Sequence, residues 1–398
     1  MAMSSLALTG GFGFSRLIYS LILPSMKVHL GLTYTETGLL ATSSHAGYTV
    51  FVPVAGFLAT RHGCRLVGAA SLVGTGLMVL LMGLSTGFAM AVPVQFLVGM
   101  ASGGAVVAAT AVMSAWFAPH KRGLANGLMS IGLGVGFFLV GPLVPYIIAT
   151  FEPNGWRYAW FSFGALVVIM GIVVGLFMRD RPENKGLLPV GQAARPEAAD
   201  SVSTGSGLAS VYRSRALWHI SILYGVFGFV YINYATFFAA YLQQEVGLEA
   251  SAVGNAWAIS GIGIIVGGVG WGLLSDVIGR KRALVLAFLS LGAAIFLFTI
   301  PGIAGFYYLS ALLFWTVQPG VPVIMGAAVG DHVGGRLAPA ATGLAILFLG
   351  AGQAVGPSVG GFLADSTHSF QAVFYLSALV AVAGALGLIP LQTVKGKA

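Results

Sequence analysis

One basic residue of this sequence lies where a charge is costly. Arg16 falls inside an apolar stretch that covers about residues 5–26, and a charged side chain there costs several kcal/mol if it faces lipid. We therefore expect Arg16 to face a wet cavity or a partner. The sequence places no carboxylate in the middle of any apolar stretch. Because a guanidinium offers the paired donors that a carboxylate accepts, we predict that Arg16 binds a small organic anion.

A purely structural role for Arg16 is the alternative. Its guanidinium could be satisfied by helix carbonyls or polar side chains, or the side chain could snorkel toward one face of the membrane. Tyr19 and Ser20 follow Arg16 by three and four residues, and this spacing places all three on one helical face. The two residues could hydrogen-bond the anion, or they could simply anchor the arginine.

A histidine in the second apolar stretch is the next candidate. His45 lies at mid-depth with Tyr48 and two threonines on its helical face, and histidine changes its charge near neutral pH. It is the one mid-span residue of this sequence that we expect to be able to carry a proton. His45 and Tyr48 could also contact the anion. Alternatively, His45 is a neutral residue that is hydrogen-bonded to a neighbouring helix.

Several polar residues in the second half of the sequence could reach the same anion. They lie at mid-depth in their apolar stretches, where a polar group needs a partner. Aromatic stripes are more often packing than binding, and amides often join helices in membranes, so structural roles compete with binding. The candidates are Tyr231, Asn233, Tyr234, Gln318 and Gln353.

Motifs of enzymes and of cofactor or metal sites are missing from the sequence. It contains no P-loop, no HExxH and no GxSxG string. Its single cysteine, Cys64, excludes an intramolecular disulfide and a thiolate metal cluster. We therefore expect no enzymatic activity, no cofactor and no metal, and no direct use of ATP.

The composition requires that most of the chain lie in lipid. The 398 residues are 57% hydrophobic and only 8% charged, with a mean hydropathy of +0.92, whereas soluble proteins are about 25% charged. A helix needs about 20 apolar residues to cross a bilayer. We predict an all-α membrane protein with twelve transmembrane helices at about 5–26, 35–59, 67–85, 87–117, 122–149, 156–178, 217–242, 251–275, 283–301, 304–329, 338–364 and 370–391.

The basic residues predict the orientation of these helices. If both termini are cytoplasmic, all but three of the nineteen lysines and arginines fall in cytoplasmic segments, and the exceptions are Arg16, Lys27 and Arg157. This bias is what the positive-inside rule demands. The net charge of +8 therefore indicates topology rather than nucleic-acid binding, and we expect a multi-pass protein of the inner membrane of a bacterial-type cell, in contact with the lipid bilayer.

The two halves of the sequence repeat each other. At an offset near 216 residues, the pair Gly31-Leu32 aligns with Gly247-Leu248, and Gly63 aligns with Gly279. A linker rich in charge, proline, glycine and serine separates the halves. We predict a six-helix bundle at 1–178, a cytoplasmic linker at 179–216 and a second six-helix bundle at 217–398. Two bundles related by an axis along the membrane normal, around a midplane cavity, form a transporter architecture.

Two loops at equivalent places carry a family resemblance. The strings GFLATRHGCR, from Gly56, and GLLSDVIGRKR, from Gly272, resemble the G-x-L-x-D-R-x-G-R-K/R loop of the major facilitator superfamily. The resemblance implies that these loops control conformational change. Only the second copy keeps the acidic residue, while the first has Thr60, so we expect an asymmetric latch; topology-setting charge is the alternative role. The loop residues concerned are Gly56, Arg61, Gly63, Arg65, Asp276, Gly279 and Arg280.

A narrower resemblance starts at Gly13. The string GFSRLIYSLILPSM is similar to the opening of the YbfB/YjiJ-like branch, and the basic residue in the first span is more loosely similar to that of monocarboxylate porters. Gln95 stands where many proton-coupled members of the superfamily have an arginine. This difference argues against proton antiport.

These observations together predict a secondary transporter. We expect it to move a small, monocarboxylate-like organic anion across the inner membrane by alternating access, inward and together with protons, as a monomer. The alternatives are an exporter of drugs or other amphipathic compounds, which an aromatic cavity would suit, and a membrane sensor that transports nothing.

Overall fold

The computed structural model describes the whole chain except residues 119–120, 192–212 and 392–398. The side chains of residues 122–124, 126, 184–185 and 333–340 are also outside the description. The protein is an all-α membrane protein with twelve transmembrane helices in two bundles of six. Ten helical segments of the described chain are long and apolar enough to cross a membrane. The other two spans are a long, more polar helix of 29 residues and an apolar helix of 17 residues, α3 and α14.

The first bundle consists of α1 (Ala2–Leu8), η1 (Thr9–Leu17), α2 (Tyr19–Leu30), α3 (Tyr34–His62), α4 (Cys64–Gly83), α5 (Phe88–Trp116), α6 (Arg122–Thr150) and α7 (Gly155–Phe177). Its first three elements together make the first span. A short 3-10 helix, η3 (Pro182–Lys185), follows. The second bundle consists of α9 (Arg215–Gln244), α10 (Ala250–Ile278), α11 (Arg280–Phe298), α12 (Ala304–Val317), α13 (Gly320–Thr367) and α14 (Gln371–Gly387).

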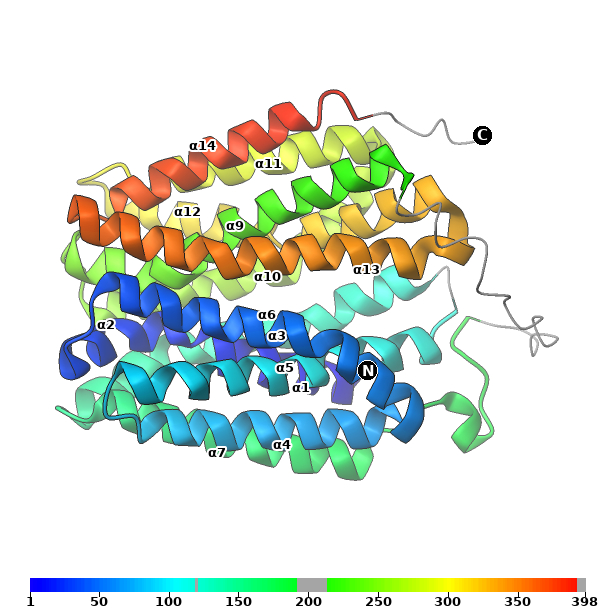
Figure 1. Cartoon of the computed structure of the whole chain (residues 1–398), viewed down its shortest axis with the longest axis horizontal. Coiled ribbons are helices and arrows are strands. Elements are labelled where there is room, and N and C mark those ends of the chain that lie inside the picture. The colour runs from blue at the N-terminus through cyan, green and yellow to red at the C-terminus, as the bar shows by residue number, and fades with distance from the viewer. Residues whose placement is uncertain (119–120, 192–212, 392–398) are drawn as a thin grey trace.

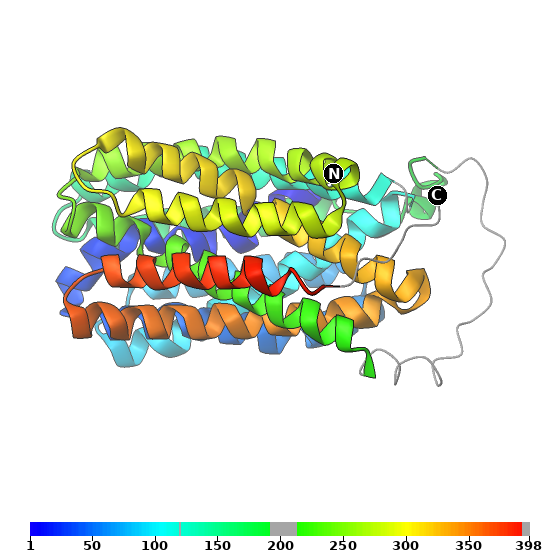
Figure 2. The same cartoon turned by 90° about the horizontal axis from the view of Figure 1, so that it is seen from above.

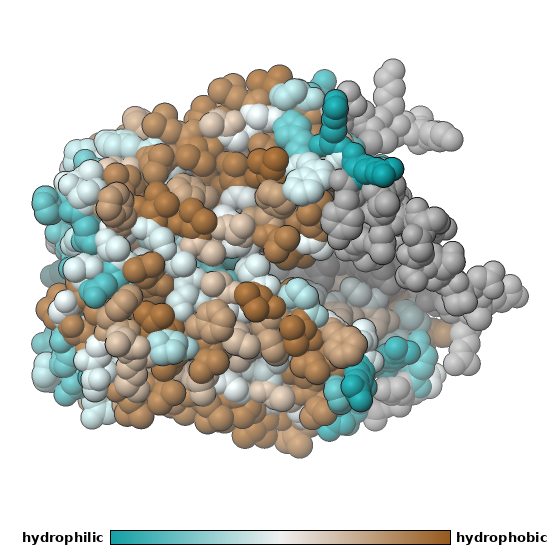
Figure 3. Space-filling view, in the orientation of Figure 1, coloured by the Kyte–Doolittle hydropathy of each residue, from teal (hydrophilic) through white to brown (hydrophobic). Residues whose placement is uncertain are grey.

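The helices run roughly parallel to one long axis. Figure 1 shows the first bundle, from blue to teal, below the second, from green to red, and Figure 2 shows the same parallel arrangement from above. We call the end where α7 ends and α9 begins the linker end, and the other the opposite end. Figure 3 shows apolar side chains covering the middle of the visible face and polar side chains gathered at its ends. This distribution suits a bilayer.

The bundles meet along two seams. One joins α6 to α10, and the other joins α3 to α13. Glycines allow the backbones of α6 and α10 to touch: a Cβ on Gly141 would collide with the carbonyl of Gly254, and a Cβ on Gly261 would collide with the carbonyl of Gly134. The hydrophobic effect does not hold helices together in lipid. Close van der Waals packing at small residues, as in these crossings, stabilises the contact between helices instead.

Two segments differ from the continuous helices that the sequence predicts. The first span contains a nine-residue π-helix, η1, which hydropathy cannot reveal. The predicted span at 304–329 is interrupted between α12 and α13, where Pro319 precedes the new helix and has no N–H to donate to the earlier one. The helical backbone then continues through residues 333–340 into the next span, so α13 covers parts of two predicted helices. Most of the predicted linker, 192–212, lies outside the described residues.

Candidate functional site

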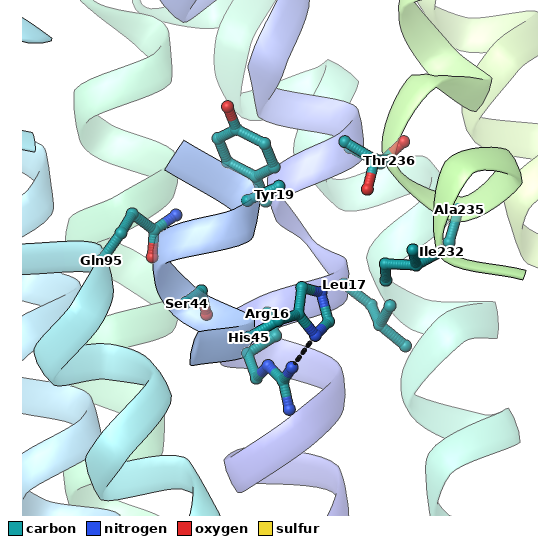
Figure 4. Close-up of a pocket in the computed structure, with 11 residues that line it drawn as sticks. Arg16, Leu17, Tyr19, Ser44, His45, Gln95, Ile232, Ala235 and Thr236 are labelled. Atoms are coloured by element: carbon teal, nitrogen blue, oxygen red, sulfur yellow. Dashed lines mark hydrogen bonds between the residues drawn. The ribbon is translucent and has the colours of Figure 1, made fainter. Parts of the chain in front are cut away.

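A small cavity lies between the bundles at mid-depth. Its lining comes from the first span, α3, α5 and α9, and comprises Arg16, Leu17, Tyr19, Ser20, Ala41, Ser44, His45, Gln95, Ile232, Ala235 and Thr236. Figure 4 shows Arg16 and His45 pointing toward each other, with Gln95 on one side and the α9 residues on the other. The volume of about 20 Å³ suffices for roughly one water molecule. An organic anion therefore enters this site only when the bundles move.

The π-helix η1 delivers Arg16 to the cavity. Its wider turns redirect the side chains that follow, and Arg16 lies in its last turn. Gly11 allows η1 to pack closely on α5, because a Cβ at this position would lie 2.9 Å from Cβ of Ala105. The Ser15 hydroxyl donates to the Gly11 carbonyl at 2.7 Å and supports the turn. Long π-helical segments are rare and tend to mark functional sites.

Arg16 is buried with only part of its hydrogen-bonding capacity used. The side chain is 6% exposed, and Nη2 donates to Nδ1 of His45. The guanidinium lies 4.5 Å from the ring centroid of Tyr48 and 5.0 Å from that of Phe12, which stabilises a cation. Within the described chain, Nε and Nη1 of Arg16 have no hydrogen-bond partner. Two buried donors are thus free beside the cavity.

His45 connects Arg16 to the second bundle. Its Nδ1 lies 3.1 Å from Oε1 of Gln353 on α13, and Nε2 of Gln353 donates to the Tyr231 hydroxyl of α9 at 3.2 Å. A single Nδ1 accepts when it is unprotonated and donates when it is protonated. It therefore cannot accept from Arg16 and donate to Gln353 at the same time. Whether Nδ1 carries a proton therefore decides whether His45 forms a hydrogen bond with Arg16 of the first bundle or with Gln353 of the second.

The structure brings together six of the predicted contact residues, namely Arg16, Tyr19, His45, Tyr48, Tyr231 and Gln353. The Tyr19 hydroxyl is already paired, because it donates to the Thr37 carbonyl at 2.8 Å, and Figure 4 shows the Tyr19 side chain pointing away from Arg16 and His45.

The other three predicted contacts lie elsewhere. Tyr234 stacks on Phe314 with ring centroids 3.9 Å apart, and its hydroxyl lies 2.8 Å from Oγ of Ser310, so it belongs to the core of the second bundle. Asn233 is fully buried beside Gly360 of α13. Gln318 is half-buried at the end of α12. These residues lie at the predicted depth along their helices. Whether such a residue reaches the cavity depends on which face of the helix it occupies.

Among the cavity residues that were not predicted as contacts, two carry buried polar atoms without a partner in the described part of the chain. Ser44 and Gln95 are 4% and 1% exposed, and neither Oγ of Ser44 nor Oε1 of Gln95 has a partner among the described residues. Ser44 immediately precedes His45. Gln95 replaces an arginine that is common in the superfamily resembled by the loops. Its depth in an apolar stretch was the available signal.

The two resembling loops differ as their sequences do. In the second copy, Asp276 forms an ion pair with Arg280, whose Nε lies 3.7 Å from Asp331. In the first copy, which lacks the acid, the carboxylate of Asp180 accepts from the backbone N–H of Arg65 at 2.5 Å. The first group of contacts lies in the C-terminal half of the chain and the second in the N-terminal half, so neither joins the two bundles. Gly63 and Gly279 have φ of +86° and +89°, which explains why both copies need glycine there.

Polar contacts join the bundles at the opposite end. The Asp365 carboxylate of α13 accepts from the backbone N–H groups of Tyr34 and Thr35, at 3.0 and 2.6 Å, where α3 begins. The Tyr34 hydroxyl donates to Oε1 of Gln244 at 2.6 Å, and the Tyr34 ring packs on Phe370 at 4.6 Å between centroids. These contacts hold the two bundles together at the opposite end.

A family comparison identifies the fold. The model of the Major Facilitator Superfamily matches residues 6–248 and 220–397. The chain belongs to this superfamily. The match confirms the family predicted from the two loops, while the narrower YbfB/YjiJ-like branch stays a prediction. Because the Major Facilitator Superfamily consists of transporters, the chain is a multi-pass membrane protein and not an enzyme.

Individual relatives in the superfamily are distant but cover nearly the whole chain. The hexuronate transporter of Bacillus subtilis (strain 168) is 23% identical over 93% of this chain and 89% of its own length. The probable sulfoacetate transporter SauU of Cupriavidus necator is 24% identical over 95% and 91%. The membrane sensor protein UhpC of Escherichia coli (strain K12) is 26% identical over 95% and 88%. A variant of the nucleoside transporter NupG superposes with a TM-score of 0.77 at 15% identity, covering 98% of this chain and 99% of NupG.

Proposed function

We propose that this protein imports a small organic anion by alternating access, and that Arg16 binds the carboxylate of that anion. The observation that carries the proposal is the pair of unpaired buried donors on Arg16, at a cavity whose described lining contains no carboxylate. Leaving such donors unsatisfied is costly. A bound carboxylate would accept from both and neutralise the buried charge.

The relatives and the placement of charge support this proposal. Two relatives named above are transporters of anions by their names, hexuronate and sulfoacetate. We place the linker end in the cytoplasm, since Arg61, Arg65, Arg179 and Arg280 cluster in the segments there and basic residues stay inside. Both termini are then cytoplasmic, the membrane is the inner one, and the anion enters from the opposite end. The protein acts as a monomer.

Protons drive the uptake through His45. The groups that contact its ring are the Arg16 guanidinium and the Gln353 amide, and the nearest titratable groups around Arg16 itself are the hydroxyls of Tyr48 and Tyr231. The guanidinium disfavours a second positive charge on His45, and an anion bound to Arg16 removes that repulsion. Anion and proton therefore bind cooperatively, as symport requires. The protonated Nδ1 would donate to Gln353, the contact that is 3.1 Å long here.

Counterflow in proteoliposomes tests the proposal. Liposomes preloaded with one unlabelled compound from panels of monocarboxylates and lipophilic cations would take up the same labelled compound if it is carried. We expect saturable exchange of a monocarboxylate that Arg16→Gln reduces about 10- to 100-fold, the loss expected for charge-assisted hydrogen bonds. Arg16→Lys keeps the charge and should retain more activity. Unchanged carboxylate exchange in Arg16→Gln, or exchange of cations alone, would reject the assignment.

A pH series on the same liposomes tests the coupling. An inward proton gradient should drive accumulation of the anion, and His45→Ala should abolish this dependence on the gradient while anion exchange at equal pH persists. If the accumulation of the His45→Ala variant follows pH as in the wild type, His45 does not carry the proton.

A sensor without transport is the second candidate, because the relative UhpC is a membrane sensor protein at 26% identity. The counterflow panel separates the two functions: a sensor would bind the anion, raising the melting temperature of the purified protein, without carrying it across the membrane.

A further inference from the structure

We infer that the anion is a hydroxylated monocarboxylate, and that Ser44 and Gln95 form a subsite for its hydroxyl group beside Arg16. The inference rests on the proposed function and extends it from the charge of the cargo to the rest of its chemistry. It starts from two polar side chains that no other part of the described structure uses.

Oγ of Ser44 and Oε1 of Gln95 are buried and have no hydrogen-bond partner in the part of the chain that the structure describes. Both residues line the same cavity as Arg16, and both are at most 4% exposed. Figure 4 shows the two side chains on the same side of the cavity, with Ser44 between Gln95 and His45. Buried polar groups in proteins are nearly always hydrogen-bonded. Two orphans at one cavity therefore indicate a ligand.

Neighbouring hydroxyls on the same helices have hydrogen-bond partners, unlike these atoms of Ser44 and Gln95 in the described chain. On α3, the Ser43 hydroxyl donates to the Val92 carbonyl at 2.8 Å, and the Thr49 hydroxyl donates to the His45 carbonyl at 2.9 Å. On α5, the Ser102 hydroxyl donates to the Gly99 carbonyl at 2.8 Å. These nearby hydroxyls are satisfied, whereas Oγ of Ser44 and Oε1 of Gln95 have no partner among the described residues.

The chemistry of these groups selects a hydroxyl. An amide both donates and accepts, as does the serine hydroxyl, and a ligand hydroxyl complements either group in either orientation. A second carboxylate only accepts, and it would need a second cation. Among the described lining residues, Arg16 is the one permanent cation, and the α5 residue at the cavity is the neutral Gln95. The subsite therefore favours one carboxylate plus a hydroxyl over a dicarboxylate or an unsubstituted acid.

The expected discrimination is large enough to measure. A site whose polar groups are left unpaired by an analogue without the hydroxyl loses about 10- to 100-fold in affinity, from the cost of one or two unsatisfied groups. An apolar cavity would instead bind the less polar analogue equally well or better.

Calorimetric titration of the full-length protein in detergent tests the subsite. The ligands are matched pairs, lactate against propionate and 3-hydroxybutyrate against butyrate, with malonate and tartrate as dianions. We expect the wild type to bind the hydroxylated member of at least one pair about 10-fold or more tightly than its partner, and to bind the dianions more weakly than that member. Gln95→Met and Ser44→Ala should each lower this ratio by weakening the hydroxylated acid, with the unsubstituted acid within about twofold of its wild-type affinity. Ser102→Ala is the matched control on α5 and should leave the ratio unchanged.

Two outcomes would overturn the inference: a wild-type ratio near one in both pairs, or a ratio that survives both substitutions. The wild-type ratio needs no variant, so the test stands even if a variant fails to fold. The proposed function fails separately. The proposed function is refuted if no monocarboxylate binds, or if Arg16→Gln leaves the affinity for both members of each pair unchanged.

Discussion

Asp365→Asn should release the opposite ends of the two bundles. In the structure, two oxygens of one carboxylate accept from two backbone N–H groups of the other bundle, at 3.0 and 2.6 Å. Asparagine retains one acceptor and turns an NH2 group toward the second N–H. The substitution also removes the negative charge from the start of α3, where the helix dipole favours it.

The size of the effect follows from these contacts. A hydrogen bond to a charged acceptor contributes about 1.5–3 kcal/mol, and a charge at a helix N-terminus contributes about 0.3–1 kcal/mol. Asp365 is only half-buried, and water replaces part of both interactions once the bundles separate. We therefore expect a net loss of about 1–2 kcal/mol, which shifts the balance between closed and open forms by about 5- to 30-fold.

Double electron–electron resonance measures this balance. Because Cys64 is the single cysteine, a Cys64→Ser background accepts spin labels at Val28→Cys and Glu249→Cys, two exposed positions near the opposite end of the two bundles. Asp365→Asn should increase the population at long distance.

Glu245→Gln is the matched control, because the Glu245 carboxylate accepts from the backbone N–H of Phe370 within one bundle. A distance distribution for Asp365→Asn that matches the wild type would refute the role of Asp365 in holding the bundles together. Opening of the bundles to the same extent by Glu245→Gln would refute it as well.

Two further predictions concern residues that pack the bundles. Gly261→Val places side-chain atoms against the backbone of α6 and should destabilise the protein by about 1–3 kcal/mol or more through overpacking. A lowered melting temperature checks this, and Gly270→Val, with open space around its Cβ, should have little effect. Tyr234→Phe removes the hydroxyl that pairs with Ser310 and should cost about 1 kcal/mol of stability. Anion affinity should remain at the wild-type value, and a loss of affinity would mean that Tyr234 reaches the cavity after all.

Much of the fold could be predicted from the sequence because lipid imposes strong constraints. Hydropathy places the spans, and the glycine spacing near 216 residues pairs the loops that contain Gly63 and Gly279. The π-helix η1 could not be predicted, since its residues are as apolar as those of an α-helix and only its hydrogen bonds differ. The interruption before α13 had a signal in Pro319, which hydropathy ignores.

The site residues whose burial in lipid is costly could be predicted from the sequence. Residues whose role depends on which helical face meets the cavity could not. Arg16 and His45 are expensive in lipid, so each had to find a partner, and the structure places them in contact. Tyr234 and Asn233 lie at the right depth on α9, but Tyr234 packs on α12 and Asn233 on α13 rather than at the cavity. The partners of a tyrosine or an amide depend on how neighbouring helices are rotated, and a single sequence does not contain that information.

The affinity of a carboxylate relative to its neutral amide tests the central claim most directly. For the monocarboxylate that the counterflow assay identifies, calorimetric titration of the acid and of its primary amide isolates the single charge that Arg16 is proposed to bind. The wild type should prefer the acid by about 10- to 100-fold, and Arg16→Gln should reduce this preference to near one. A preference for the acid that persists in Arg16→Gln would contradict the role of Arg16 as the anion-binding residue.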